Sequence, residues 1–107
     1  MTLHHAKKVV IITEKLISKG ISNIIEECGA TGYTTVLAGG KGDRNIRCTT
    51  ERASVIDDFA NIKFEVIVNH ESIAEDIMNK VTEKYFKDYP GITYMEEVEI
   101  LRPKKFD

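Results

Sequence analysis

The chain has 107 residues, of which 42% are hydrophobic, and this is enough for one small domain spanning residues 1–107. A formal net charge of −2 argues against general nucleic-acid binding, which needs a basic face. The sequence has no run of eighteen apolar residues, and its N-terminal residues lack the apolar region of a signal peptide, so we expect a cytoplasmic protein.

The first third of the chain predicts a strand, a helix and a second strand. Residues 9–12 are all β-branched and apolar, as in a buried strand. Apolar residues then recur at helical spacing, with Thr13 as the expected N-cap and Gly29 as the expected left-handed stop. Gly20, in the middle of this helix, indicates either close packing or a helix that tolerates glycine. Residues 32–38 are rich in β-formers and predict the second strand.

A glycine-rich basic segment follows the second strand directly. Gly40 and Gly42 let the backbone approach a ligand closely, because they carry no Cβ. Lys41 adds a point charge, and the guanidinium groups of Arg44 and Arg47 can each grip two oxygens. We therefore interpret this segment as a candidate phosphate site. The segment belongs to a stretch of about twenty residues without periodicity, and loops of that length in small domains are usually functional or disordered.

The second half of the chain repeats the order of strand, helix and strand. Residues 60–68 alternate between apolar and polar, as in a strand with one buried face. Asn69 or Ser72 can cap the second helix, Ser72 with Glu75 forms a capping box, and Pro90-Gly91 predicts the end of the helix. The last strand is expected at residues 92–101. Glu96 interrupts its apolar side, which either a bulge or an oligomer contact would explain.

This order of elements predicts an α+β fold of the ferredoxin-like βαββαβ type. In this fold, two helices cover one face of a four-stranded antiparallel sheet. The other face needs a cover, so we expect the chain to associate through it, with Tyr33, Phe64 and Tyr94 as candidates to lie there.

Several segments of the chain resemble one known family. They are the Gly-Ala-Thr-Gly-Tyr-Thr of residues 29–34, the Gly-Gly-Lys-Gly-Asp-Arg-Asn-Ile-Arg of residues 39–47, the Ala-Asn-Ile-Lys-Phe-Glu of residues 60–65 and the Lys-Tyr-Phe-Lys-Asp-Tyr-Pro-Gly-Ile of residues 84–92. Together they resemble the PII-like signalling proteins, and most of all the SbtB type, which regulates a cyanobacterial bicarbonate transporter.

The resemblance implies a trimer-forming domain that is a sensor and not an enzyme. It implies a homotrimer that binds adenine nucleotides (AMP, cAMP, ADP or ATP) in clefts between neighbouring copies, with no cofactor or metal. Residues 40–59 would be a long mobile T-loop that docks on a partner, expected to be a membrane transporter for bicarbonate in a carbon-concentrating mechanism. Membrane contact would then be peripheral, through the transporter. The motif match implies nucleotide contacts by Gly40, Lys41, Gly42, Arg44, Arg47, Gly91, Ile92 and Arg102.

Three other functions stay open at this point. One is a carboxysome-associated PII-like sensor of ADP or AMP together with bicarbonate. A second is slow nucleotide phosphohydrolysis, for which Asp43 is the only carboxylate adjacent to the basic residues. The third is a metal-tolerance protein of the CutA type, which Cys28 and Cys48 favour little because they are isolated from each other in the sequence.

Overall fold

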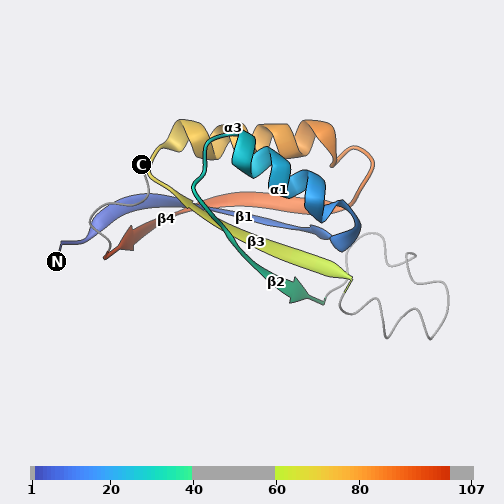
Figure 1. Cartoon of the computed structure of the whole chain (residues 1–107), viewed down its shortest axis with the longest axis horizontal. Helices are drawn as coiled ribbons and strands as arrows, with labels where there is room; N and C mark the ends of the chain where they lie inside the picture. The colour runs from blue at the N-terminus through green and yellow to red at the C-terminus, as the bar shows by residue number, and fades with distance from the viewer. Residues whose placement is uncertain (1, 40–59, 102–107) are drawn as a thin grey trace.

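A computed structural model describes residues 2–39 and 60–101 of the chain. Within these ranges the elements in chain order are β1 (His4–Glu14), the 3-10 turn η1 (Lys15–Ile17), α1 (Ser18–Glu27), β2 (Thr34–Ala38), β3 (Asn61–Val68), α3 (Glu71–Lys84) and β4 (Gly91–Ile100). The strands form one antiparallel sheet in the order β2-β3-β1-β4, and both helices lie on the same side of it (Figure 1). This arrangement confirms the predicted ferredoxin-like fold.

The hydrophobic core lies between the helices and the face of the sheet that they cover, which we call the helix face. Because side chains alternate along a strand, Val9 and Ile11 of β1 point to this face, and Val10 and Ile12 point to the opposite, open face. Phe64 also packs in the core, so its predicted place on the open face was wrong. The helices contribute the fully or nearly fully buried residues Ile17, Ile21, Ile24, Ile25, Ala74, Ile77 and Val81.

Neither helix begins with the cap that the sequence predicts. The Thr13 hydroxyl donates to the Pro90 carbonyl at 2.9 Å, across the sheet, and the chain makes the η1 turn before α1 begins. Helix α3 begins at Glu71, with His70 as an N-cap that makes no side-chain hydrogen bond. Ser72 therefore lies inside the helix, and the predicted capping box is absent. At the first helix, a contact with Pro90 takes up the hydroxyl that would have served as the cap.

The helix ends and the central glycine show the role of close packing. Gly29 has φ of 98°, so the predicted left-handed stop is confirmed. Helix α3 ends at Lys84, earlier than predicted, and Tyr85 to Tyr89 form turns before Pro90. A Cβ on Gly20 would overlap the Tyr85 hydroxyl and lie 2.6 Å from its Cζ. Gly20 therefore lies against the ring of Tyr85, just after α3, which favours the close-packing interpretation.

Strand β4 directs most of its apolar side chains away from the helices, with Met95, which packs against the core, as the exception. It pairs with β1 over ten consecutive residues, which leaves no place for the bulge that Glu96 suggested. The register puts Ile92, Tyr94 and Glu96 on the open face, where Glu96 lies 3.4 Å from Lys8. Tyr94 thus lies on the predicted face. Tyr33 does not, because it packs 5.6 Å from the Phe64 ring and donates to Ser22 on the helix side.

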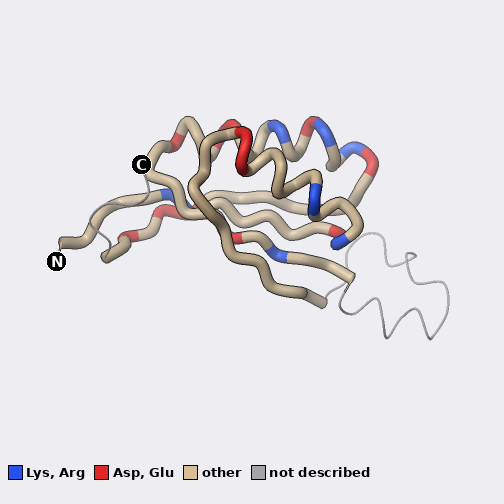
Figure 2. Tube along the Cα trace, viewed as in Figure 1, with Lys and Arg blue, Asp and Glu red and all other residues tan. Residues whose placement is uncertain are grey.

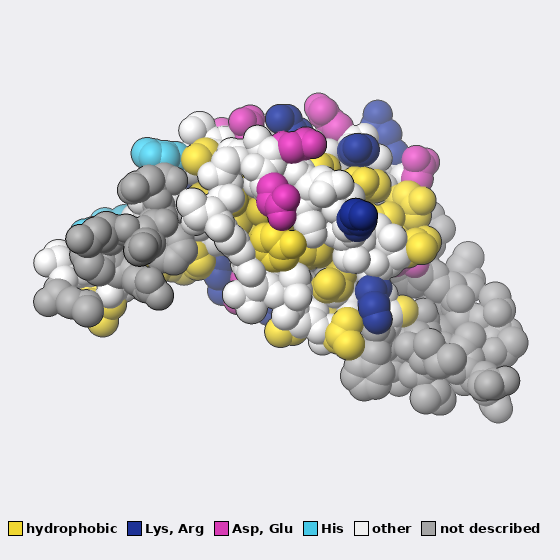
Figure 3. Space-filling view, viewed as in Figure 1, with side chains coloured by type: hydrophobic (Ala, Val, Ile, Leu, Met, Phe, Trp, Pro, Cys, Tyr) yellow, Lys and Arg dark blue, Asp and Glu magenta, His cyan; other side chains and the backbone are white. Residues whose placement is uncertain are grey.

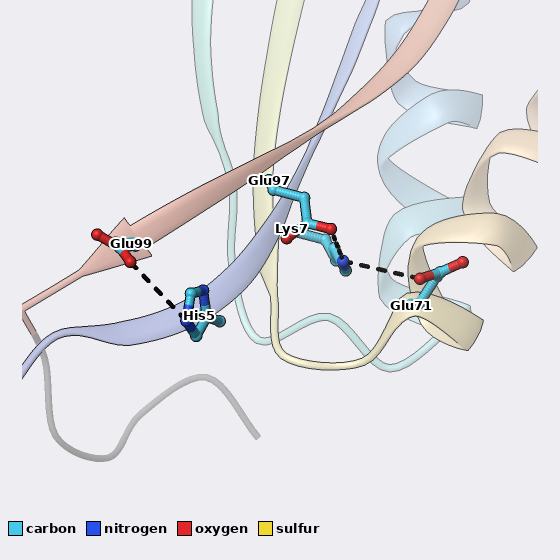
Figure 4. A network of polar contacts seen from close by, with 5 residues as sticks. All are labelled: His5, Lys7, Glu71, Glu97 and Glu99. Atoms are coloured by element: carbon cyan, nitrogen blue, oxygen red, sulfur yellow. Dashed lines mark hydrogen bonds and ion pairs between the residues drawn. The ribbon is translucent and has the colours of Figure 1, made fainter.

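A network of polar contacts ties the start of β1 to β4 and to the start of α3 (Figure 4). Lys7 Nζ lies 2.8 Å from Glu97 Oε2 and 3.7 Å from Glu71 Oε1, and His5 lies 3.8 Å from Glu99. The hydrogen bond from Lys7 lowers the pKa of Glu97 below its ordinary value of 4.5, and the same bond raises the pKa of Lys7.

Among the described residues, no helix is long and apolar enough to cross a membrane.

These pKa shifts predict how the network contributes to stability as pH changes. Because Glu97 has a lowered pKa when folded, its contribution is present at neutral pH and is lost as pH falls below about 4.5. Because Lys7 has a raised pKa, its contribution is lost only above its ordinary value of 10.5. We expect Glu97→Gln to lower Tm at pH 7 and to lower it progressively less as pH falls below 4.5 toward 3. Thermal unfolding across this range measures both, with Glu99→Gln as the matched control, and an equal loss at the two pH values would contradict the assignment.

Candidate functional site

The segment that carries the predicted phosphate residues leaves the sheet and returns to it at one place. Strand β2 ends at Ala38 and β3 begins at Asn61, and these two residues are directly paired. The backbone N–H of Lys15 donates to the Ala60 carbonyl at 2.7 Å, which joins the end of β1 to the same place. This end of the sheet, here called the loop end, therefore holds both ends of the intervening segment.

Most of the predicted nucleotide residues lie outside the described part of the chain. They are Gly40, Lys41, Gly42, Arg44, Arg47 and Arg102, and the expected T-loop of residues 40–59 lies outside it as well. Of the predicted site, the structure places only Gly91 and Ile92, which begin β4 at the loop end.

Close packing fixes the turn before β4. A Cβ on Gly91 would lie 2.5 Å from Cζ of Phe86 and 3.0 Å from the Ile12 carbonyl oxygen, so glycine is required whether or not a ligand binds. The hydrogen bond from the buried Thr13 hydroxyl holds the Pro90 carbonyl on the other side of this turn. The turn is therefore preorganised by contacts within the chain.

Ile92 lies beside this rigid turn and is itself exposed. It pairs with Ile12 on the open face, and 57% of its surface is accessible. Val36 of β2 lies in the same row of the sheet, with Lys63 and Ile12 between, and is 52% accessible. In Figure 3, apolar side chains are also exposed over β2, near the lower edge of the view. Apart from Lys63, the described part of the loop end thus offers backbone and apolar surface that suits the flat ring of a base.

The two halves of the predicted site start from opposite edges of the sheet. Ala38 belongs to edge strand β2 and Gly91 to edge strand β4, with β3 and β1 between them. Three strand spacings separate such edges by roughly 14 Å. A nucleotide that touches both must therefore either lie across the end of one sheet or lie between two copies whose edges meet.

Sequence reasoning missed two residues that shape this end of the molecule. Thr13 was interpreted as a helix cap, and Phe86 was not singled out, although the two residues hold Pro90 and Gly91 in place. Both contacts join residues that no local pattern relates to each other, so the sequence alone could not have identified them.

Cys28, the one cysteine in the described residues, packs at the edge of the core. Burial raises the pKa of its thiol, which keeps it protonated and less nucleophilic than a free thiol at neutral pH. Cys48 lies outside the described residues.

Comparison with known proteins identifies the family. The family model described as "Nitrogen regulatory protein P-II" matches residues 6–105. The chain therefore belongs to the PII family.

Solved structures agree with this assignment. A PII-like signalling protein of Thermus thermophilus is 33% identical, with 94% of each chain covered and a TM-score of 0.75. CPII of Thiomonas intermedia, solved with ADP and bicarbonate, is 22% identical, with 95% of this chain and 94% of CPII covered and a TM-score of 0.76. B. subtilis GlnK, solved with ATP, is 16% identical, with 92% of this chain and 85% of GlnK covered and a TM-score of 0.60. At this level of identity, CPII and GlnK show a shared fold.

Substitutions at the turn should separate packing from ligand contact. Gly91→Ala should lower stability by about 1–3 kcal/mol, because Phe86 and the Ile12 carbonyl must move, and should also weaken nucleotide binding. Ile92→Ala removes an exposed side chain, so stability should change by less than about 0.5 kcal/mol while nucleotide binding weakens.

Urea unfolding and calorimetric titration with ADP measure the two effects. Gly32→Ala is the matched control for Gly91→Ala, because a Cβ there has no heavy atom within 4 Å. Unchanged ADP affinity in Ile92→Ala would remove Ile92 from the site.

Proposed function

We propose that this protein is a regulator that senses adenine nucleotides and does not act as an enzyme. Membership of the PII family is the observation that supports this proposal most directly. The glycine-lysine-arginine segment that follows β2 supplies the groups that phosphates require, and the Gly91–Ile92 turn supplies a rigid apolar surface for a base.

The ligand that the residues suit best is a nucleotide with few phosphates. Lys41, Arg44 and Arg47 can neutralise one or two phosphate groups, and the segment has no cluster of carboxylates to hold Mg²⁺. AMP, cAMP and ADP therefore fit this set better than magnesium-bound ATP does.

The proposed assembly is a homotrimer with nucleotides in the clefts between copies. The separation of the two half-sites on opposite edges of the sheet supports such clefts, because adjacent copies can bring a β2 edge next to a β4 edge. In this arrangement Arg102, just after β4, would reach the nucleotide from a neighbouring copy.

The signal is a change in residues 40–59, the proposed T-loop. Capture of phosphate by Lys41, Arg44 and Arg47 orders the base of this segment and changes the surface that a partner meets. The partner we propose is a membrane transporter for bicarbonate, as for the SbtB type, with the regulator itself cytoplasmic.

A second candidate is a sensor that reads ADP or AMP together with bicarbonate. The CPII structures with ADP, AMP and bicarbonate favour it as an alternative, since CPII has the same fold. The two candidates differ in whether bicarbonate changes nucleotide affinity.

Calorimetric titration tests the sensing part of the proposal. AMP, cAMP, ADP and ATP are each titrated with and without bicarbonate into the full chain and into Arg47→Ala. We expect micromolar binding of at least one nucleotide and a loss of about tenfold or more in Arg47→Ala, because a charged hydrogen bond is removed. Lys80→Ala, on α3, is the control for loss of one positive charge. Absence of binding by all four nucleotides would overturn the proposal, and affinity that rises with bicarbonate would favour the second candidate.

Bicarbonate uptake tests the partner. Cells that lack the protein should show altered uptake of labelled bicarbonate, and the full chain should restore normal uptake. A variant in which a short Gly-Ser linker replaces residues 48–57 keeps the proposed phosphate residues and should fail to restore it, because most of the proposed docking segment is lost. Uptake that is the same with and without the protein would exclude a bicarbonate transporter as the partner.

A further inference from the structure

The open face of the sheet has a pattern that an ordinary solvated face does not require. Ile92, Tyr94 and Val98 of β4 point to this face, whereas Met95 is the one large apolar side chain on the helix side of the same strand, between Thr93 and Glu97. In a strand that only covers a core, the apolar side would be expected on the helix face. The distribution of apolar side chains on β4 is therefore that of a strand whose open side is covered.

A chain of alternating charges crosses the middle of this open face. Lys63 Nζ lies 3.2 Å from Glu65 Oε2, Lys8 Nζ lies 3.9 Å from the same oxygen, and Lys8 Nζ lies 3.4 Å from Glu96 Oε1. The four side chains come from β3, β1 and β4 and carry no net charge together. We call them the ion chain. Figure 2 shows that charged positions of both signs occur within the strands.

Apolar residues lie on both sides of the ion chain. Val36, Ile12 and Ile92 lie in the same row as Lys63, at the loop end, and Val98 lies beside the buried Ala6 in a row beyond Lys8. The side chain of Lys8 is only 26% accessible, whereas that of Glu96 is 52% accessible and so has room for another partner. The open face therefore combines apolar side chains with four charges that sum to zero.

This pattern matches a second copy of the same chain better than other partners. A partner whose surface carries charges of one sign would meet as many like charges as opposite ones on this face. A wholly apolar partner would bury the four charged side chains without new partners for them. A second copy offers apolar rows and both signs of charge, so each exposed end of the ion chain can meet its opposite. Such charge complementarity governs which partners and registers are accepted more than it raises affinity.

We propose that the ion chain is buried between copies of this chain and selects like copies in one register. This inference rests on the assembly of copies proposed above, and it adds that Lys8, Lys63, Glu65 and Glu96 decide which copies assemble. It does not depend on nucleotide binding.

A sign-reversed chain tests the proposal. The variant Lys8→Glu, Lys63→Glu, Glu65→Lys, Glu96→Lys keeps the contacts within each copy but inverts every sign. It is co-expressed with the original chain under two different tags, and native mass spectrometry without nucleotide counts mixed oligomers. We expect both chains to assemble with themselves, and mixed oligomers to fall to less than about a tenth of the statistical share, because like charges would meet. The control reverses the pair Lys7→Glu, Glu97→Lys on the helix face and should mix freely.

Single variants keep the test decisive if the fourfold variant does not fold. Glu96→Lys should weaken self-association at least tenfold by analytical ultracentrifugation, whereas Glu97→Lys, the next residue on the opposite face, should leave it within about twofold.

Statistical mixing, a folded sign-reversed chain that stays monomeric, or equal effects of Glu96→Lys and Glu97→Lys would each overturn the inference. An original chain that is monomeric would overturn both this inference and the proposed assembly, whereas nucleotide titration reports separately on sensing.

Discussion

The structure depends on one constraint, which is that the two helices within residues 2–39 and 60–101 cover only one of the two faces of the sheet. Both helices pack on the same side, over the side chains of Val9, Ile11, Phe64 and Val66. The other side of the sheet combines apolar rows with paired charges, and β4 turns its more apolar side toward it. The packing within one copy therefore covers only one face of the sheet, and the assembly that we propose covers the other face.

The same constraint links the fold to the candidate site. The antiparallel order places the ends of β1 and β2 and the starts of β3 and β4 together at the loop end. Thr13 and Phe86 then fix the turn at Gly91, Thr13 through a contact across the sheet and Phe86 by packing against the glycine. Because the turn is already fixed, it loses little conformational entropy when a base binds. More of the binding free energy is then available to order the phosphate segment.

The sequence predicted the elements and the topology well because both follow from periodicity. The alternation of residues 60–68 and the helical spacing before Gly29 determine element type with little dependence on the rest of the chain. Helix starts and face assignments were less predictable. Thr13 looked like a cap and Phe64 looked available for the open face, but tertiary contacts decided both. Ser72 also looked like a cap, but α3 begins one residue before it.

Prediction of the site was limited in a different way. Motifs identified candidate residues, but they could not reveal that Gly91 is already required by Phe86 or that Ile92 lies on the open face. The significance of Glu96 depended on register, because only pairing with β1 places it beside Lys8. These features arise from tertiary contacts and could not be inferred from local sequence.

The central claim is that nucleotides bind in clefts that form only when copies of the chain assemble. Native mass spectrometry of the protein with ADP tests this claim most directly. The account predicts one ADP per chain in the assembled species and none on monomers present in the same spectrum, since monomers hold only half of each cleft. Equal occupancy of monomers and assembled species would contradict it and would place the complete site within one chain.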